Sequence, residues 1–160
     1  MKIAIAFLVS LICIQLFACS NSDAATTTQN NGSYTTEKGN NDTTINKMII
    51  TIGSAVFTAT LNNNTTITAF KAMLPLTINM SELNGNEKFY YFSTTLPTNA
   101  STGGNIQVGD LMLYGNNCLV LFYEGVNTSY SYTRLGRIDN TSGLVAALNS
   151  EGVTVKFEKQ

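Results

Sequence analysis

Short stretches of alternating apolar residues, separated by turns rich in Asn and Gly, constrain the fold of this chain more than any other feature. From Met48 onward, segments such as 57–61 and 153–158 carry an apolar side chain at every second position, the period of a strand with one buried face. Gly53-Ser54 and Asn84-Gly85-Asn86 are turn signals between such segments. Residues 118–123 are apolar throughout, which predicts a central strand buried on both faces.

We expect eight strands and two short helices in residues 48–160. The strands are predicted near 49–52, 57–61, 76–80, 88–92, 110–114, 118–123, 130–138 and 153–158. Residues 93–108, rich in Thr, Gly and Asn, are predicted to form a long loop. These elements favour a mainly β fold, a closed eight-stranded barrel, because closure removes exposed strand edges.

The two helices are expected at 66–74 and 141–149. In the first, Ile67, Phe70 and Leu74 have helical spacing. Its start can be capped by Asn64 or Thr65, and Pro75 ends it. In the second, Thr141 is the candidate cap.

Residues 1–19 have the pattern of a secretory leader. Lys2 supplies the only charge, and an apolar stretch follows over 3–14, interrupted by Ser10. Residues 16–19, Leu-Phe-Ala-Cys, resemble the lipobox of bacterial lipoproteins, which implies cleavage before Cys19 and acylation of that cysteine. A plain signal peptide or a membrane anchor is the alternative, although the stretch is shorter than the ~20 residues of a membrane-spanning helix. We therefore expect a signal peptide over 1–18 and a lipid anchor in the membrane of the bacterial cell envelope, outside the cytoplasm.

Residues 19–47, between the leader and the β-rich domain, are rich in Ser, Thr and Asn and poor in apolar side chains. Such a composition cannot bury enough surface to offset the entropy of ordering, so we expect a disordered tether behind the lipidated Cys19. Residues 42–44, Asp-Thr-Thr, resemble a bacterial O-glycosylation acceptor, although a plain solvated linker is the simpler interpretation.

Charge and missing residue types exclude several classes of function. Nine basic and ten acidic side chains give a net charge of −1, which does not suit a nucleic-acid-binding protein. The sequence contains no His, which excludes His-based acid–base catalysis and His ligation of metals. The carboxylates form no Asp-x-Asp loop, so we expect no metal and no cofactor. With Cys13 removed and Cys19 acylated, Cys118 has no disulfide partner, and we expect a buried, unreactive thiol.

Five segments resemble the cyclophilin-like domain family of small bacterial proteins. They occur in order over 48–160 and are LPLTINM (74–80), NGNEKFYYF (84–92), VGDLMLYG (108–115), LVLFYEG (119–125) and SYTRLGRID (131–139). The resemblance implies an eight-stranded barrel whose ends are closed by the two short helices. It implies no particular activity, because a fold does not fix function.

The relation to true cyclophilins raises peptidyl-prolyl isomerase activity as an alternative function. That reaction needs an apolar proline pocket and a cation that favours the twisted amide. The enzymes' Gln-Gly-Gly-Asp-like stretch is matched only loosely by residues 107–110, and the only arginines are Arg134 and Arg137. We therefore assign no catalytic residue, and whether the protein is an enzyme stays open, with a non-catalytic function favoured.

Candidate ligand contacts are polar and aromatic side chains that alternation can place outside the core. Arg134 shares one side of its strand with two tyrosines, although its simpler role is to cover an apolar face or to make a surface cation–π contact. Asp110 is expected to accept backbone N–H bonds in a turn, with ligand binding as the alternative. Glu87 and Lys88 are expected to form a solvated pair. The candidate ligand contacts are Tyr90, Asp110, Tyr123, Tyr130, Tyr132 and Arg134.

The sequence as a whole favours a lipid-anchored envelope protein whose domain binds a peptide or a small ligand without chemistry. A prolyl isomerase and a purely structural cell-surface protein are the two alternatives.

Overall fold

The computed structural model describes residues 46–160, which form nine strands and two helices. The strands are β1 (Lys47–Ile52), β2 (Ala55–Leu61), β3 (Leu76–Leu83), β4 (Glu87–Tyr91), β5 (Ser101–Ile106), β6 (Asp110–Tyr114), β7 (Cys118–Phe122), β8 (Val126–Ile138) and β9 (Gly152–Lys159). The helices are α1 (Thr65–Ala72) and α2 (Leu144–Ala147). The predicted signal peptide, Cys19 and the tether as far as residue 45 lie outside the described residues.

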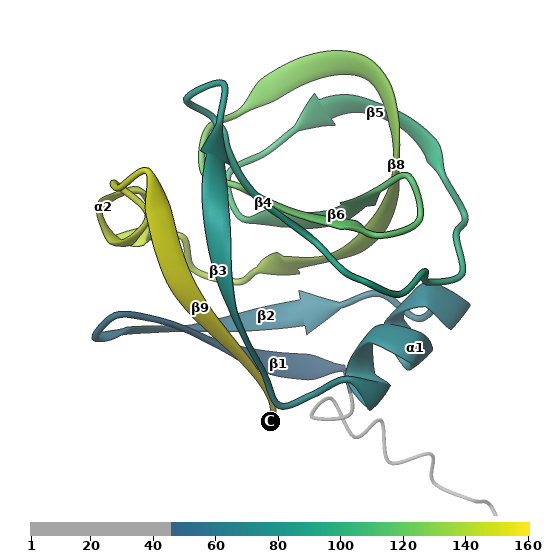
Figure 1. The fold of residues 1–160 in the computed structure, drawn as a ribbon. Coiled ribbons are helices and arrows are strands. Elements are labelled where there is room, and N and C mark those ends of the chain that lie inside the picture. Colours follow the sequence, from purple (N-terminus) through teal and green to yellow (C-terminus); the bar gives the residue numbers. More distant parts are fainter. Residues whose placement is uncertain (1–45) are drawn as a thin grey trace, which may run out of the picture. The chain divides into compact units, whose positions relative to one another are not determined.

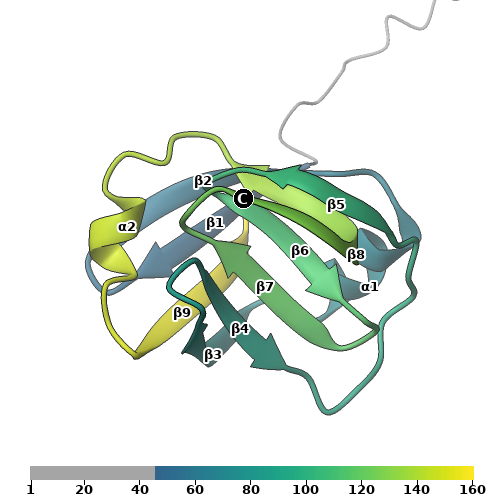
Figure 2. The ribbon, with the colours of Figure 1, turned by 90° about the horizontal axis from the view of Figure 1, so that it is seen from above.

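Eight strands close into a ring, in the order β2-β1-β9-β3-β4-β7-β6-β8, and β8 returns to pair with β2 (Figures 1 and 2). The pairing that closes the ring joins Ala59–Leu61 to Gly136–Ile138. Gly136 permits this approach, because a Cβ at that position would collide with the backbone oxygen of Thr60. The mainly β fold and the closed eight-stranded arrangement predicted from the sequence are confirmed.

The main hydrophobic core fills the interior of the ring. Every strand of the ring contributes inward-facing residues to it, and both helices pack against it on opposite sides of the ring (Figure 2). From α1, Ile67 and Phe70 are buried in this core, and Leu144 and Leu148 are buried at α2. The predicted helix cap Asn64 is confirmed, since its side chain accepts a hydrogen bond of 2.8 Å from the Ile67 N–H.

Two local predictions are wrong. Residues 101–106 form β5 instead of a loop, because their backbone pairs with β8 although Ser-Thr-Gly-Gly-Asn carries no apolar alternation. At α2 the residue before the helix is Gly143 with a φ of 82°, and no side chain caps the helix, so Thr141 is not its cap.

Strand β8 is long and changes partner along one edge. Its first part pairs with β5, its last part pairs with β2, and its other edge pairs with β6 from Tyr132 onward. The first part of β8 and β5 together arch away from the ring, above β4 and β6 in Figure 1. The arch creates a second, smaller apolar cluster on the outer face of the sheet, formed by Ile106, Met112, Cys118, Val120, Phe122 and Tyr132.

Among residues 46–160, neither helix has the length and apolar character needed to cross a membrane.

Candidate functional site

A pocket of about 430 Å³ lies on the outer face of the sheet, beside the arch of β5 and β8. Its floor is the outward side of β7, where Cys118, Val120 and Phe122 are buried. Its walls come from β4, from Tyr114 at the end of β6, and from the first part of β8. The aromatic side chains that line it are Phe89, Tyr91, Tyr114, Phe122, Tyr130 and Tyr132. We call this cavity the aromatic pocket.

The exposed apolar side chains of the domain concentrate at the aromatic pocket. Six large apolar side chains are exposed in the described part of the chain, and four of them line this pocket: Leu83, Tyr91, Tyr114 and Tyr130. The other two, Val56 and Val145, stand on β2 and α2. Exposed apolar side chains gathered in a concave site are typical of a binding surface, whereas scattered ones are not.

The rings of the pocket hold one another in place through edge and tilted contacts. The ring of Tyr114 lies with its centroid 6.2 Å from that of Tyr130 and 5.4 Å from that of Tyr132. Phe122 then meets Tyr132 edge-on at 5.8 Å. Such pairs add to the stability that burial alone supplies, so the aromatic wall is preformed.

Strand alternation on β4 places Glu87, Phe89 and Tyr91 toward the aromatic pocket. These residues stand opposite Phe122, Val120 and Cys118 of β7, which supply the pocket floor. Lys88 and Tyr90, between them, stand opposite Leu121 and Leu119 of the main core.

Glu87 is the acidic residue of the aromatic pocket, and it is 7% exposed. Burial, and secondarily the negative charge of Glu82, raises the pKa of the Glu87 carboxyl above the ordinary glutamate value. Burial, and then the Glu87 charge, raises the pKa of the Tyr132 phenol to about 12. The carboxyl group therefore acts electrostatically on the aromatic wall of the pocket.

Asn86 adds a second polar group to the same side of the pocket. Its Oδ1 is buried and is the one such side-chain atom in the described range without a hydrogen-bond partner. The backbone oxygen of Asn86, in contrast, accepts bonds from the N–H groups of Tyr123 and Glu124. Asn86 and Glu87 thus bring oxygen acceptors without partners among the described residues to a mainly apolar cavity.

Lys88 points to the opposite face of the sheet, where it is 1% exposed. Its Nζ lies 2.5 Å from Oε2 of Glu82, donates to the carbonyl of Ser150, and lies 5.5 Å from the ring centroid of Tyr123. Although burial works in the other direction, bonds from Lys88 and Tyr123 keep the pKa of Glu82 below its ordinary value. The predicted solvated pair of Glu87 and Lys88 is therefore wrong: both are buried, on opposite faces.

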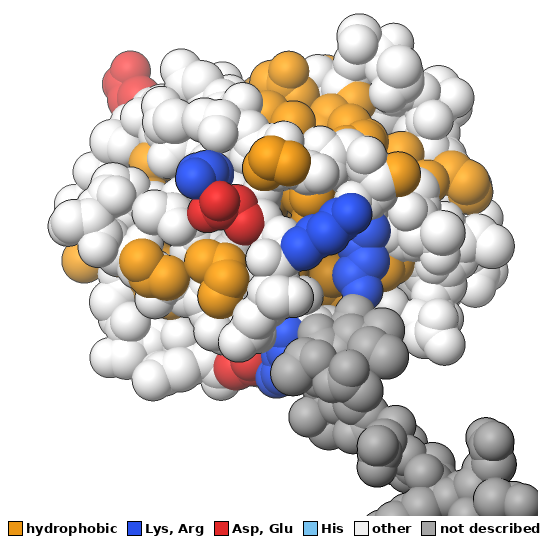
Figure 3. All heavy atoms as spheres, turned by 90° about the horizontal axis from the view of Figure 1, so that it is seen from below, with side chains coloured by type: hydrophobic (Ala, Val, Ile, Leu, Met, Phe, Trp, Pro, Cys, Tyr) orange, Lys and Arg blue, Asp and Glu red, His pale blue; other side chains and the backbone are white. Residues whose placement is uncertain are grey.

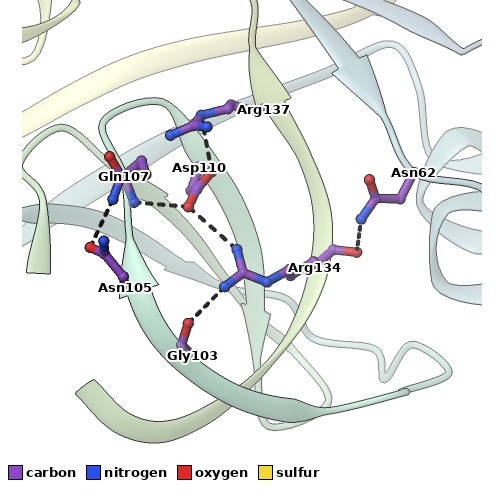
Figure 4. Close-up of polar contacts among 7 residues, drawn as sticks. All are labelled: Asn62, Gly103, Asn105, Gln107, Asp110, Arg134 and Arg137. Atoms are coloured by element: carbon purple, nitrogen blue, oxygen red, sulfur yellow. Dashed lines mark hydrogen bonds and ion pairs between the residues drawn. The ribbon is translucent and has the colours of Figure 1, made fainter. Parts of the chain in front are cut away.

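Asp110 and Arg134 belong to a separate polar cluster at the start of β6 (Figure 4). Oδ2 of Asp110 accepts a hydrogen bond of 2.9 Å from the Gln107 N–H, the turn role expected for it. The same carboxylate pairs with Arg134 Nη1 at 3.4 Å and with Arg137 Nε at 3.3 Å. Arg134 Nη2 also donates to the Gly103 carbonyl at 2.7 Å, which ties β8 to β5. In this cluster, the Asp110 cluster, the carboxylate is paired within the fold.

The structure thus separates the six candidate contacts predicted from the sequence into four places. Tyr130 and Tyr132 line the aromatic pocket, and Asp110 and Arg134 meet in the Asp110 cluster. Tyr90 packs against Phe92 and the main core at a centroid distance of 5.5 Å. Tyr123 lies beside a second hollow, where its hydroxyl donates to Glu82 at 2.8 Å.

Sequence reasoning missed Glu87 and Asn86 as pocket residues. The alternation over 87–91 places Glu87 on the same side of the strand as Phe89 and Tyr91, and this could have been predicted from the sequence. The signal that this side is covered was missing, because the predicted strand began at 130, whereas β8 begins at Val126 and its first part forms the far wall of the pocket.

Cys118 is buried at 4% exposure on the floor of the aromatic pocket, as expected. Burial raises the pKa of its thiol, which disfavours the nucleophilic thiolate. Within 46–160, no three Cys, Asp or Glu side chains gather in a way that could hold a metal ion.

Figure 3 shows the face of the domain that is turned away from the viewer in Figure 2. In Figure 3 its hydrophobic side chains lie in separate groups among polar atoms, and basic and acidic side chains both occur there. This face therefore shows neither a continuous apolar surface nor a surface of a single charge sign.

Comparisons with known proteins agree with this architecture. A family model described as the cyclophilin-like family matches residues 50–158. The solution structure of a hypothetical protein from Archaeoglobus fulgidus superposes with a TM-score of 0.57 and 17% sequence identity, covering 76% of this chain and 99% of that one. At this identity the likeness shows the fold alone. The comparison with curated proteins finds no match.

Proposed function

The chain belongs to the cyclophilin-like family, and within that fold we propose that the aromatic pocket binds a small ligand or a peptide side chain without chemical reaction. One observation carries the proposal: four of the six exposed large apolar side chains of the described domain meet in one preformed concavity. Apolar surface in contact with water is unfavourable, and where such side chains gather on a protein surface they mark a binding site.

The residues available for chemistry favour binding over catalysis. The buried thiol of Cys118 and the phenol of Tyr132 both have raised pKa values, so neither is an activated nucleophile. A prolyl isomerase needs a cation beside the reacting amide. Both arginines of the chain contact Asp110, and neither lines the aromatic pocket.

The binding proposal can be tested by NMR on the full chain with labelled Val methyl groups. Val120 and Val126 line the aromatic pocket, so the neutral aromatic probe p-cresol should shift their methyl signals. Tyr130→Ala removes part of the wall and should weaken the shifts. Val56→Ala is the matched control, because Val56 is 64% exposed but lies on β2, outside the pocket. If p-cresol did not shift the Val120 and Val126 signals, or if the shifts were the same in Tyr130→Ala, the proposal would be overturned.

We also propose that the domain is exported and held at a membrane by a lipid on Cys19. The support is the leader pattern of 1–18 and the lipobox-like residues 16–19. A second cysteine, Cys13, lies inside the leader and provides a matched control. In bacteria fed radiolabelled palmitate, the wild type and Cys13→Ser should take up label and Cys19→Ser should not. Equal labelling of both variants would contradict the anchor.

A further inference from the structure

The aromatic pocket contains a carboxylate without a counter-ion, on a residue that is 7% exposed. Glu87 and Asp110 are the two acidic residues buried in the described part of the chain, and only Asp110 has partners. Within residues 46–160, no hydrogen-bond donor or cation pairs with the Glu87 side chain, and no Lys or Arg lines the pocket. The adjacent cation, Lys88, is committed to Glu82 on the opposite face of β4. An uncompensated buried charge is unfavourable, and an external cation would compensate it.

The walls around Glu87 suit a cation that carries carbon substituents. Six aromatic rings line the cavity, and the faces of such rings attract cations within about 6 Å of their centroids. A small metal ion prefers several charged or carbonyl oxygen ligands, and Glu87 is the single carboxylate in a lining that is mostly aromatic and aliphatic. An organic cation gains from both the carboxylate and the rings, and its alkyl part keeps the apolar floor dry.

Next to Glu87, the Oδ1 atom of Asn86 is buried and has no hydrogen-bond partner among the described residues. It lies on the residue before Glu87, and both residues belong to the cavity lining. A group that supplies positive charge would compensate the Glu87 carboxylate. Neither a carboxylate nor a neutral hydrocarbon ligand would do so.

Building on the proposed binding function, we infer that the aromatic pocket recognises an alkylammonium group, with its nitrogen beside Glu87 and its carbon atoms against the tyrosine and phenylalanine rings. The group can belong to a small free amine or to the lysine side chain of a peptide. The recognition chemistry is the same for both, and the experiment distinguishes them.

The test compares cations with neutral molecules of the same shape on the full chain, followed through the Val120 and Val126 methyl signals. Choline is paired with 3,3-dimethyl-1-butanol, in which carbon replaces the charged nitrogen. A tripeptide with a central lysine is paired with the same peptide containing norleucine. We expect the cation of at least one pair to bind about tenfold more tightly than its neutral counterpart. A preference in the peptide pair alone assigns the lysine side chain, and a preference in the choline pair alone assigns a free cation.

The variant Glu87→Gln keeps the size of the side chain and removes its charge. It should reduce the preference for the cation to about one, because only the cation loses an electrostatic contact. Glu124→Gln makes the same charge change at an exposed residue outside the pocket and should keep the preference.

The outcomes separate this inference from the function on which it rests. Equal binding of cation and neutral partner to the wild type, or a preference that survives in Glu87→Gln, would overturn the ammonium assignment and leave a ligand-binding pocket in place. If no probe moved the Val120 and Val126 signals, the binding function itself would fail.

Discussion

Glu87 and Asp110 are similarly buried, and each is the first residue of a strand in the same sheet, yet their surroundings are opposite. Asp110 accepts a backbone N–H and pairs with two arginines. Glu87 has aromatic neighbours and, among the described residues, no partner of its own. One carboxylate therefore helps to hold the fold, and the other is available to something outside it.

Burial alone does not reveal the role of these two carboxylates, because the role also depends on whether the carboxylate has bonding partners within the fold. A buried charge with partners pins strands together, as the Asp110 cluster does where β8 meets β5 and β6. A buried charge without partners lowers stability, and proteins tolerate such a group where a ligand compensates it. Perturbed carboxyl groups in a cavity are candidates for function for this reason.

The largest effect should come from breaking the Asp110 cluster. Asp110→Ala removes the acceptor of the Gln107 N–H and the counter-charge of two half-exposed arginines. We expect the free energy of unfolding to fall by about 2 kcal/mol, measured by urea denaturation.

Asp139→Ala is the control for this loss, because Asp139 also pairs with a cation, Lys47, at 2.8 Å but lies at the surface. It should lower the free energy of unfolding by less than about 1 kcal/mol. If Asp110→Ala were no more damaging than Asp139→Ala, the structural role assigned to the Asp110 cluster would be wrong.

The second effect is smaller and has the opposite sign. Glu87→Gln removes the unpaired buried charge, so the free energy of unfolding of the ligand-free protein should rise by about 1 kcal/mol near neutral pH. The same urea denaturation measures it, and Glu124→Gln should leave stability unchanged. A clear loss of stability in Glu87→Gln would mean that the carboxylate has a stabilising partner after all.

The pH dependence of stability sharpens the same contrast. Burial raises the pKa of Glu87 in the folded protein above the ordinary glutamate pKa of ~4.3. As the pH rises, Glu87 therefore stays protonated to a higher pH in the folded state than in the unfolded state. Unfolding then releases a proton, and the contribution of Glu87 to stability is lost as the pH rises through the folded pKa. The wild type should therefore lose stability relative to Glu87→Gln as the pH rises above about 4.

Glu82 and Asp139 work in the other direction. Although burial opposes it, bonds to Lys88 and Tyr123 lower the pKa of Glu82, and bonds to Lys47 and Thr60 lower that of Asp139. Their contributions are present above the ordinary carboxyl pKa and are lost as the pH falls through the folded value. Because both residues are common to the wild type and Glu87→Gln, the difference between the two pH profiles isolates Glu87. A difference that is constant with pH would contradict the raised pKa.

The fold was largely predictable because alternation is a local property. The residues of β2, β6, β7 and β9 alternate or are fully apolar, and their pairing follows from the need to bury one face. The turn at Asn84-Gly85 was also readable, since both residues adopt positive φ as such hairpin turns require.

The candidate site was only half predictable, because its far wall is the first part of β8, which begins at Val126, earlier than the strand predicted at 130–138. The Ser-Thr-Gly-Gly-Asn-Ile sequence of β5 pairs with β8 through its backbone, and this pairing forms the arch beside the outer face of β4 and β7. Without this first part of β8, which pairs with β5, that face is expected to be solvated, and so is Glu87. Tyr130 and Tyr132 were identified as candidates, whereas the charge they surround was taken for a surface group.

The smallest expected effect is on prolyl isomerisation, where we expect none. Arg134 is held by the Gly103 carbonyl and by Asp110, so its guanidinium is not directed to an amide in the aromatic pocket. In a protease-coupled assay with a proline-containing peptide, the full chain should leave the slow spontaneous rate unchanged, and Arg134→Ala should behave identically. A faster rate that disappears in Arg134→Ala would place a reacting amide next to the Asp110 cluster. Asp110, whose carboxylate is paired within the fold, would then support catalysis, and the contrast between Asp110 and Glu87 would be wrong.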